Sequence, residues 1–339
     1  PYTIYENVFK VQSSEVVKLN FDRNKFNIND KSIITKKRYW SPKNIAINSK
    51  NNLFDNYATS QNQIEKSLRK SIELQSYADV PIGSFLSGGI DSTLICSLQQ
   101  TQSNNKINTF SIGFDNKSFN EAKYAKKISQ YLNTNHNEII LSEKKNLDII
   151  SNLSNIYCEP FADSSQLPTF LLCNELKKYY KVALSGDGGD ELFGGYNRYI
   201  WINKLWSIIN IFPVTIRKII FKYVSSINID IVDSVFYILK KITLNYINIK
   251  FAGQKLNNLS IKLKNVNNID ELFMYFISEW TSEDKIILYH QYDTTIFYKY
   301  SRIDNFSIEE NMMIHDTMNY LPNDILTKTD RASMSNSVE

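Results

Sequence analysis

The stretch that decides the fold lies at residues 82–92, where the sequence reads IGSFLSGGIDS. An apolar run, residues 82–86, leads directly into a Ser-Gly-Gly loop, and a helical pattern starts near Asp91. A strand followed at once by a glycine loop and a helix is typical of a βα unit. The backbone N–H groups of such a loop, together with the positive end of the helix, favour binding of an anion.

The same alternation of strand and helix continues on the C-terminal side of this loop. We expect strands at residues 82–86, 107–114, 137–141 and 181–184, and helices at residues 91–102, 120–132, 147–157 and 165–180. This order predicts an α/β fold with a doubly wound parallel sheet and helices on both faces. Ligands bind such sheets at the carboxyl ends of the strands, where the strand order reverses. Loops that follow strands should therefore carry the function.

The glycines of the chain are concentrated in two loops that follow strands. Of ten glycines, seven lie in these loops, namely Gly88, Gly89, Gly186, Gly188, Gly189, Gly194 and Gly195. The second loop spans residues 185–196, reads SGDGGDELFGGY and follows the strand expected at 181–184. Glycine lets the backbone approach a ligand closely and adopt a positive φ. Both loops are therefore predicted to contact the same ligand.

The charges in the two loops indicate a metal ion. Asp91 at the start of a phosphate-binding helix would repel the phosphate unless a cation lay between them. The second loop supplies another carboxylate, Asp190. Two carboxylates facing one anion site favour Mg²⁺ shared with phosphate oxygens. The first loop has neither the Gly-Lys-Ser/Thr of a Walker loop nor the Gly-x-Gly-x-x-Gly of dinucleotide binders.

Composition excludes several other classes of protein. The 339 residues include 39 Lys and Arg against 35 Asp and Glu, and these charges read as scattered, so we expect no nucleic-acid partner. Cys96, Cys158 and Cys173 have no paired spacing, which indicates neither a disulfide framework nor a zinc site. No apolar run predicts a membrane span and no signal peptide is recognised, so we expect a cytoplasmic protein with no membrane partner. Both chain ends, Pro1 and Glu339, look truncated.

The C-terminal half is predicted to be helical, with apolar residues at helical spacing between residues 199 and 320. Basic residues lie between these apolar positions. We interpret the many Tyr and Phe side chains there as core packing, with a partner or peripheral membrane surface as the alternative. The sequence leaves the oligomeric state open, and a homodimer is one of the states it allows.

At this point the two loops resemble a known family. Residues 87–92 resemble the pyrophosphate loop of the N-type ATP pyrophosphatases (adenine nucleotide alpha hydrolase-like fold), and residues 185–196 resemble a signature of the glutamine-hydrolysing asparagine synthetase family. Residues 159–165 (EPFADSS) and 320–334 (YLPNDILTKTDRASM) resemble further segments of that family. The resemblance implies four parts: the tail of a glutaminase domain (1–42), a linker (43–61), the ATP pyrophosphatase core (62–198) and a helical continuation (199–339).

The resemblance also implies a reaction. A substrate carboxylate, aspartate in the family, attacks the α-phosphate of ATP, pyrophosphate leaves, and ammonia from glutamine displaces AMP. It implies that the residues from Ser87 to Ser92 hold pyrophosphate and that Asp91 and Asp190 hold Mg²⁺. Asp187 stands where the family has an acid–base carboxylate. The implied adenosine site comprises Leu86, Ile112, Ser185 and Gly186, and the implied substrate site comprises Ser164, Ser165, Lys328, Asp330 and Arg331.

Three departures from the family pattern keep alternatives open. Most of the glutaminase domain is absent, so we expect this chain by itself to use free ammonia, and the chain ends before the family's catalytic lysine. Members that make asparagine carry Glu at the position of Asp187, and they carry an arginine that residues 164–168 (SSQLP) lack. An arginine is the usual clamp for a small acid. The alternatives are a family member that amidates another carboxylate such as a polysaccharide sugar acid, a β-lactam synthetase, a lasso-peptide cyclase, a tRNA-modifying pyrophosphatase, or a non-catalytic nucleotide-binding remnant.

Overall fold

The structure is a computed structural model that describes residues 3–20, 34–114, 122–141, 148–243, 249, 251–264, 266–278 and 302–339. The chain divides into two compact units. The first unit comprises Pro1–Phe193 and Asp316–Glu339, and the second comprises Gly194–His315. The division thus falls close to the expected end of the core at residue 198. The last residues of the chain, however, group with the first unit rather than with the helical continuation.

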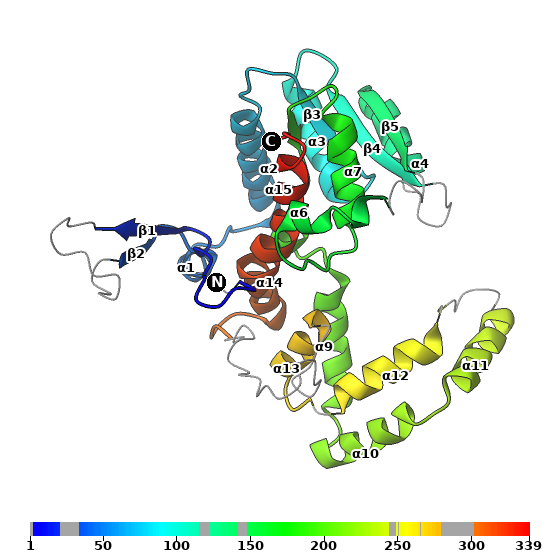
Figure 1. Cartoon of the computed structure of the whole chain (residues 1–339). Coiled ribbons are helices and arrows are strands. Elements are labelled where there is room, and N and C mark those ends of the chain that lie inside the picture. Colours follow the sequence, from blue (N-terminus) through cyan, green and yellow to red (C-terminus); the bar gives the residue numbers. More distant parts are fainter. Residues whose placement is uncertain are drawn as a thin grey trace. The chain divides into compact units, whose positions relative to one another are not determined.

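The first unit is built on the parallel sheet that the sequence predicts (Figure 1). Its strands are β3 (Ile82–Phe85), β4 (Asn108–Phe114), β5 (Asn135–Leu141) and β6 (Val182–Leu184), in the order β5-β4-β3-β6. All three strand pairings are parallel. The chain moves outward from β3 to β5 and then returns to place β6 on the other side of β3. The strand order therefore reverses between β3 and β6, the two strands that the glycine loops follow.

Helices cover both faces of this sheet, which confirms the doubly wound fold (Figure 1). On one face Leu86 of the strand end packs with Cys96 and Ala125, which lie on α3 and α4. On the other face Phe110 packs with Leu172 and Leu176 of α7. The helices of this unit are α1 (Pro42–Ser49), α2 (Tyr57–Gln75), α3 (Ile90–Gln102), α4 (Ala122–Leu132), α6 (Leu153–Tyr157), α7 (Gln166–Leu176), α8 (Gly189–Phe193), the π-helical turn η3 (Leu321–Ile325) and α15 (Leu326–Met334).

The N-terminal part of the first unit carries two strands and a helix. The strands β1 (Glu15–Leu19) and β2 (Ile34–Arg38) pair antiparallel, and α1 lies within the stretch expected to be a linker. This helix forms because Ser41 caps it, accepting a hydrogen bond from the Asn44 N–H at 3.4 Å, and Pro42 occupies its first turn. A helix is therefore compatible with the polar composition that favoured a linker.

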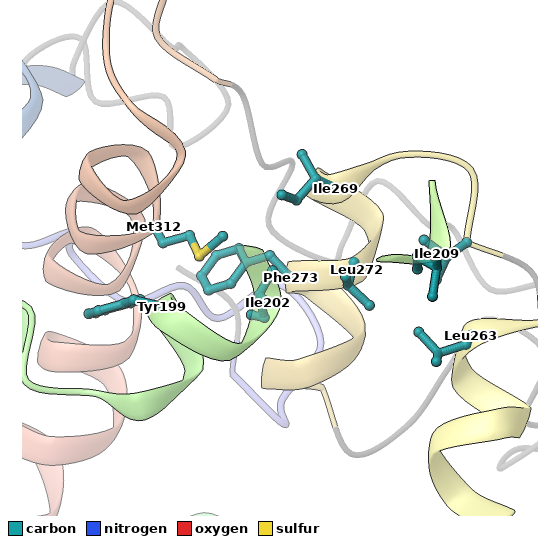
Figure 2. Close-up of a cluster of buried hydrophobic side chains, with 9 residues drawn as sticks. Tyr199, Ile202, Ile209, Leu263, Ile269, Leu272, Phe273 and Met312 are labelled. Carbon is teal, nitrogen blue, oxygen red and sulfur yellow. The ribbon is translucent and has the colours of Figure 1, made fainter. Parts of the chain in front are cut away.

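The second unit is helical and has its own core (Figure 2). Its helices are α9 (Asn197–Ile209), α10 (Val214–Ser225), α11 (Ile229–Ile242), α12 (Ala252–Leu263) and α13 (Ile269–Ile277), and α14 (Ile308–Met318) ends in the first unit. Tyr199 and Ile202 of α9 pack with Phe273 of α13 and Met312 of α14. The interpretation of the aromatic residues as core packing is correct for this cluster. Phe221 of α10 also packs against this cluster, whereas Tyr223 of α10 and Tyr237 of α11 are 73% and 59% exposed and depart from the interpretation.

Within the described part of the chain, no helix combines the length and the apolar character needed to cross a bilayer.

Candidate active site

The first glycine loop is held in shape by backbone geometry and by two serines. Gly88 has φ +91°, and a Cβ there would lie 2.9 Å from Tyr124 Cβ and 3.0 Å from the Ala125 nitrogen of α4. The Ser87 and Ser92 hydroxyl oxygens are 2.9 Å apart, and the Ser87 N–H donates to Ser92 Oγ at 3.2 Å. The loop is therefore fixed against the first turn of α3 before any ligand binds.

The second glycine loop packs directly onto the start of α3. A Cβ on Gly186 would lie 2.8 Å from the backbone nitrogen of Ser92. A Cβ on Gly189 would lie 2.6 Å from the carboxyl carbon of Asp91. Real Cβ atoms do not approach other atoms this closely, so both positions require glycine. The two loops thus meet at the point where the strand order reverses, which is where such sheets bind their ligands.

This packing places two carboxylates within electrostatic reach of each other. Burial raises the pKa of Asp91, and the negative charge of Asp190 raises it further. A cation between the two carboxylates would remove this repulsion. Among the described residues no three His, Cys, Asp or Glu side chains converge as a metal site. Asp91 and Asp190 are two carboxylates that could hold an ion such as Mg²⁺, because this ion takes one or two protein carboxylates and completes its shell with phosphate and water.

Asp187 lies in the second loop with its carboxylate exposed and oriented by two hydroxyl groups. Ser185 Oγ donates to Asp187 Oδ2 at 3.1 Å, and Thr329 Oγ1 donates to the same oxygen at 2.9 Å. Thr329 comes from α15, so the C-terminal helix helps to orient a residue of the glycine loop. An ionised carboxylate held in this way can accept a proton from a ligand.

A second cluster of charges joins α15 to the segment before α7. Lys328 forms an ion pair with Asp163 at 3.0 Å, and the two side chains are only 11% and 12% exposed. Lys328 also donates to Ser165 Oγ at 2.9 Å, and Ser165 donates its N–H and its hydroxyl to Asp163 Oδ1. Burial by itself would raise the pKa of Asp163, but the hydrogen bonds from Ser165 and Lys328 outweigh it and lower the pKa.

Asp324 of the π-helical turn completes this cluster. Burial raises its pKa to about 6, with a further contribution from the negative charge of Asp163 and an opposing one from Lys328. Its Oδ1 is buried without a hydrogen-bond partner among the described residues. Single π-helical turns are frequent at functional sites because they displace one residue from the regular helix surface.

The structure brings together some of the residues predicted for the site and separates others. Ser165 and Lys328 meet in the second cluster, whereas Asp330 and Arg331 pair with each other at 2.9 Å as exposed side chains. Ser164 is exposed. Leu86 is 1% exposed, so its side chain belongs to the core, and Ile112 packs against the clusters around Phe110 and Tyr157.

Sequence reasoning missed three residues that complete these two clusters, namely Asp163, Asp324 and Thr329. All three lie inside residues 159–165 and 320–334. The signal that could have found Asp163 is its position two residues before Ser165, a spacing typical of an Asx turn. Thr329 and Asp324 had no such signal, because their contacts depend on how α15 packs.

A comparison of the sequence with known families and proteins points to one family. The family model described as asparagine synthase matches residues 63–339. The putative asparagine synthetase (glutamine-hydrolysing) 2 of Methanocaldococcus jannaschii is 37% identical over 202 residues, which are 59% of this chain and 36% of that protein. Asparagine synthetase (glutamine-hydrolysing) 1 of Bacillus subtilis is 36% identical over 137 residues, 40% of this chain and 22% of that protein.

The alignments thus span about a third or less of these relatives. Among solved structures, an NH3-dependent NAD synthetase from Campylobacter jejuni covers 40% of this chain and 60% of its own, with 19% identity and a TM-score of 0.30.

Proposed function

The chain belongs to the asparagine synthase family, and from that premise we propose that its first unit activates a carboxylate with ATP for amide formation. The observation that carries the proposal is the meeting of the two glycine loops between β3 and β6. There Gly186 meets the backbone of α3 and Gly189 meets the Asp91 side chain, and Asp190 acts electrostatically on Asp91.

In the proposed reaction, an oxygen of the substrate carboxylate attacks the α-phosphorus of ATP. The bond from that phosphorus to the bridging oxygen breaks, and pyrophosphate leaves. The nitrogen of ammonia then attacks the acyl carbon, and the bond from that carbon to AMP breaks. Each step leaves the electron pair on a phosphate oxygen, so the protein has to stabilise negative charge more than to form bonds.

The residues of the first unit suit these tasks. The N–H groups from Ser87 to Ser92 and the start of α3 would hold the departing pyrophosphate. Asp91 and Asp190 would hold Mg²⁺, which neutralises phosphate charge when bound. Asp187, oriented by Ser185 and Thr329, would accept the proton that ammonia loses as the amide forms.

The carboxylate acceptor is proposed to be aspartate, with ammonia drawn from glutamine in the complete protein. A second candidate acceptor is a different carboxylate, such as a sugar acid. It is favoured by a specific observation: Ser165 and Lys328 are engaged with Asp163 rather than free for a small acid, and residues 164–168 carry no arginine.

Pyrophosphate release tests the proposal. The full-length protein is incubated with ATP, Mg²⁺ and ammonium, with and without aspartate. Release that depends on aspartate supports asparagine synthesis. Release that needs another carboxylate keeps the chemistry and changes the acceptor.

The metal assignment has a matched test in the same assay. Asp91→Asn and Asp190→Asn should each lower kcat at least about 100-fold, because phosphate charge is no longer neutralised. The exposed residue Asp55 provides the control, since Asp55→Asn should leave the rate unchanged. Near-normal release by either loop variant would refute the assignment, and no release by the wild type with any carboxylate would favour a nucleotide-binding remnant.

A further inference from the structure

The second unit carries an unusual concentration of positive charge. Between residues 197 and 266 the sequence has eleven Lys and Arg but only two acidic residues, Asp230 and Asp233. Because the whole chain has a net charge of +4, the remaining residues are net negative. The basic residues are therefore not scattered as the composition suggested. Nine of the eleven lie on helices α9 to α12.

The same helices expose apolar side chains in stripes. On α10 the stripe consists of Ile216, Ile219, Ile220 and Tyr223, which are between 39% and 73% exposed. These positions follow the i, i+3, i+4, i+7 spacing that places side chains on one face of a helix. An apolar face of this kind normally packs into a core. Here it lies at the surface of the second unit.

A second stripe lies on α11 and has the same character. It consists of Ile231, Val235, Ile238 and Ile242, which are between 49% and 72% exposed and share one helix face at i, i+4, i+7, i+11. The other side of α11 packs on α12, which also packs on α10 (Figure 1).

Contacts at the beginning of α12 fix this packing. The Gly253 N–H donates to Asp233 Oδ1 at 2.9 Å, and a Cβ on Gly253 would collide with the Ile229 carbonyl oxygen. The stripe on α11 is thus the face of the helix that does not pack on α12.

Lysines lie on both helices, and at 3.6 residues per turn Lys222 and Lys241 fall beside the two stripes, whereas Lys218 falls on the other side of α10. Lys218 and Lys222 lie on α10, which has no acidic residue, and Lys241 lies on α11 next to Tyr237, with its ammonium 4.6 Å from the ring centroid. None of these three lysines forms an ion pair with a carboxylate in the part of the chain that the structure describes. Their charges therefore remain available to an anionic partner.

Positive charge is also present beneath this surface. Arg217 of α10 is 4% exposed, and its Nε and Nη1 have no hydrogen-bond partner in the described residues. Its guanidinium lies 5.3 Å from the centre of the Trp206 ring, which offsets part of the cost of burying the charge. Within the described ranges no carboxylate pairs with it, so it adds to the positive potential of α10.

We propose that α10 and α11 bind the surface of an anionic lipid bilayer. Apolar stripes bordered by lysines are the pattern of helices that lie in the membrane interface, with the aliphatic side chains in the acyl boundary and the lysines among the headgroups. Tyr223 and Tyr237 suit the headgroup level. Residues 197–266 carry eleven basic residues and only two acidic ones, and this net positive charge attracts anionic lipids and repels a basic partner. This inference differs from the expectation that the protein has no membrane partner.

Co-sedimentation with vesicles tests the proposal on the 339-residue chain. We compare neutral phosphatidylcholine vesicles with vesicles containing about 30 mol% phosphatidylglycerol. The wild type should bind the anionic vesicles at least about ten-fold more strongly, and high salt should weaken the binding by screening.

Three sets of substitutions separate the contributions. Replacing Lys218, Lys222 and Lys241 with Gln should lower anionic binding about 100-fold, since each lysine near the surface contributes about five-fold. The double variant Ile219→Asn, Ile238→Asn removes apolar insertion and should lower binding to both vesicle types. The control on α4 of the first unit is Lys123→Gln, Lys127→Gln, Tyr131→Ser, which removes two exposed lysines and an exposed tyrosine and should change nothing.

Because all substituted side chains are exposed, circular dichroism and the thermal midpoint should match the wild type. The proposal is overturned if the wild type sediments with neither vesicle, or if the stripe variants bind as strongly as the α4 control. Self-association of the wild type in lipid-free solution, with the monomer restored by the double variant Ile219→Asn, Ile238→Asn, would also overturn it. The stripes would then be an interface between copies of the chain.

Discussion

At the scale of single residues, the cluster of Asp163, Asp324 and Lys328 combines two carboxyl groups with one cation. Lys328 pairs with Asp163 at 3.0 Å, and Asp324 forms no ion pair among the residues that the structure describes. Burial and the charge of Asp163 therefore raise the pKa of Asp324 to about 6. The pKa of Asp163 is lowered, so as the pH rises the contribution of Asp163 to the free energy of unfolding increases while that of Asp324 decreases.

This arrangement predicts a pH dependence of stability. A carboxyl group whose pKa is about 6 in the folded state and about 3.9 in the unfolded chain holds its proton longer when folded. Its contribution to the free energy of unfolding therefore falls as the pH rises from about 4 to about 6.

The variant Asp324→Asn removes this titration. Relative to the wild type, it should gain about 1 kcal/mol in the free energy of unfolding on going from pH 4.5, which lies between the two pKa values, to pH 7.5, which lies about 1.5 units above the folded one. Full linkage would give about 2 kcal/mol, and solvent screening of this partly exposed carboxyl group lowers it. Urea denaturation at the two pH values measures the difference, with Asp79→Asn, an exposed carboxylate, as the control. A gap between wild type and Asp324→Asn that does not vary with pH would contradict the interpretation.

At the scale of elements, the second glycine loop and α3 are in direct backbone contact. A Cβ on Gly186 would lie 2.8 Å from the Ser92 nitrogen, and the atoms it would meet belong to the backbone of a helix. A flexible side chain could rotate away from such a contact. A helix backbone has to move as a whole.

We therefore expect Gly186→Ala to destabilise the first unit by about 2 kcal/mol through overpacking. Gly89→Ala serves as the matched control in the first loop. Its Cβ would meet only Ser87 Oγ at 3.3 Å, and the expected loss is about 0.5 kcal/mol, from the change of helix cap. Equal losses in chemical denaturation would show that the loop can move away from α3.

The sequence predicts the strands of the sheet well, but it does not predict helix α1 or the side-chain contacts between distant segments. Strands at residues 82–86 and 181–184 could be found because an apolar run ends in a glycine loop, and the structure has β3 and β6 there. Helix α1 could not be found, since its signals are a single capping serine and one proline in an Asn-rich stretch. The links from Thr329 to Asp187 and from Lys328 to Asp163 join residues more than a hundred positions apart, and local patterns carry no information about them.

At the scale of the whole molecule, each unit has its own hydrophobic core. The second unit is centred on residues such as Ile202, Leu272 and Phe273, each fully buried. The first unit has separate clusters on the two faces of its sheet, one of which contains Leu176. Units with separate cores open as separate cooperative blocks in native-state exchange.

Core truncation should therefore act locally. We expect Ile202→Ala to remove about 3 kcal/mol of protection from hydrogen exchange in peptides of residues 194–315, and Leu176→Ala to do the same for the first unit. Mass spectrometry of the exchanged peptides measures both effects. Loss of protection spread evenly over the two units by either variant would contradict this division.

The contact between Gly186 and Ser92 also has a consequence for redesign. The second loop packs so closely on α3 that there is no room for a methyl group at Gly186. Exchanging one loop alone for that of a relative would therefore create a clash or a gap. A chimera that alters the proposed nucleotide site would have to transplant residues 86–93 and 185–190 together.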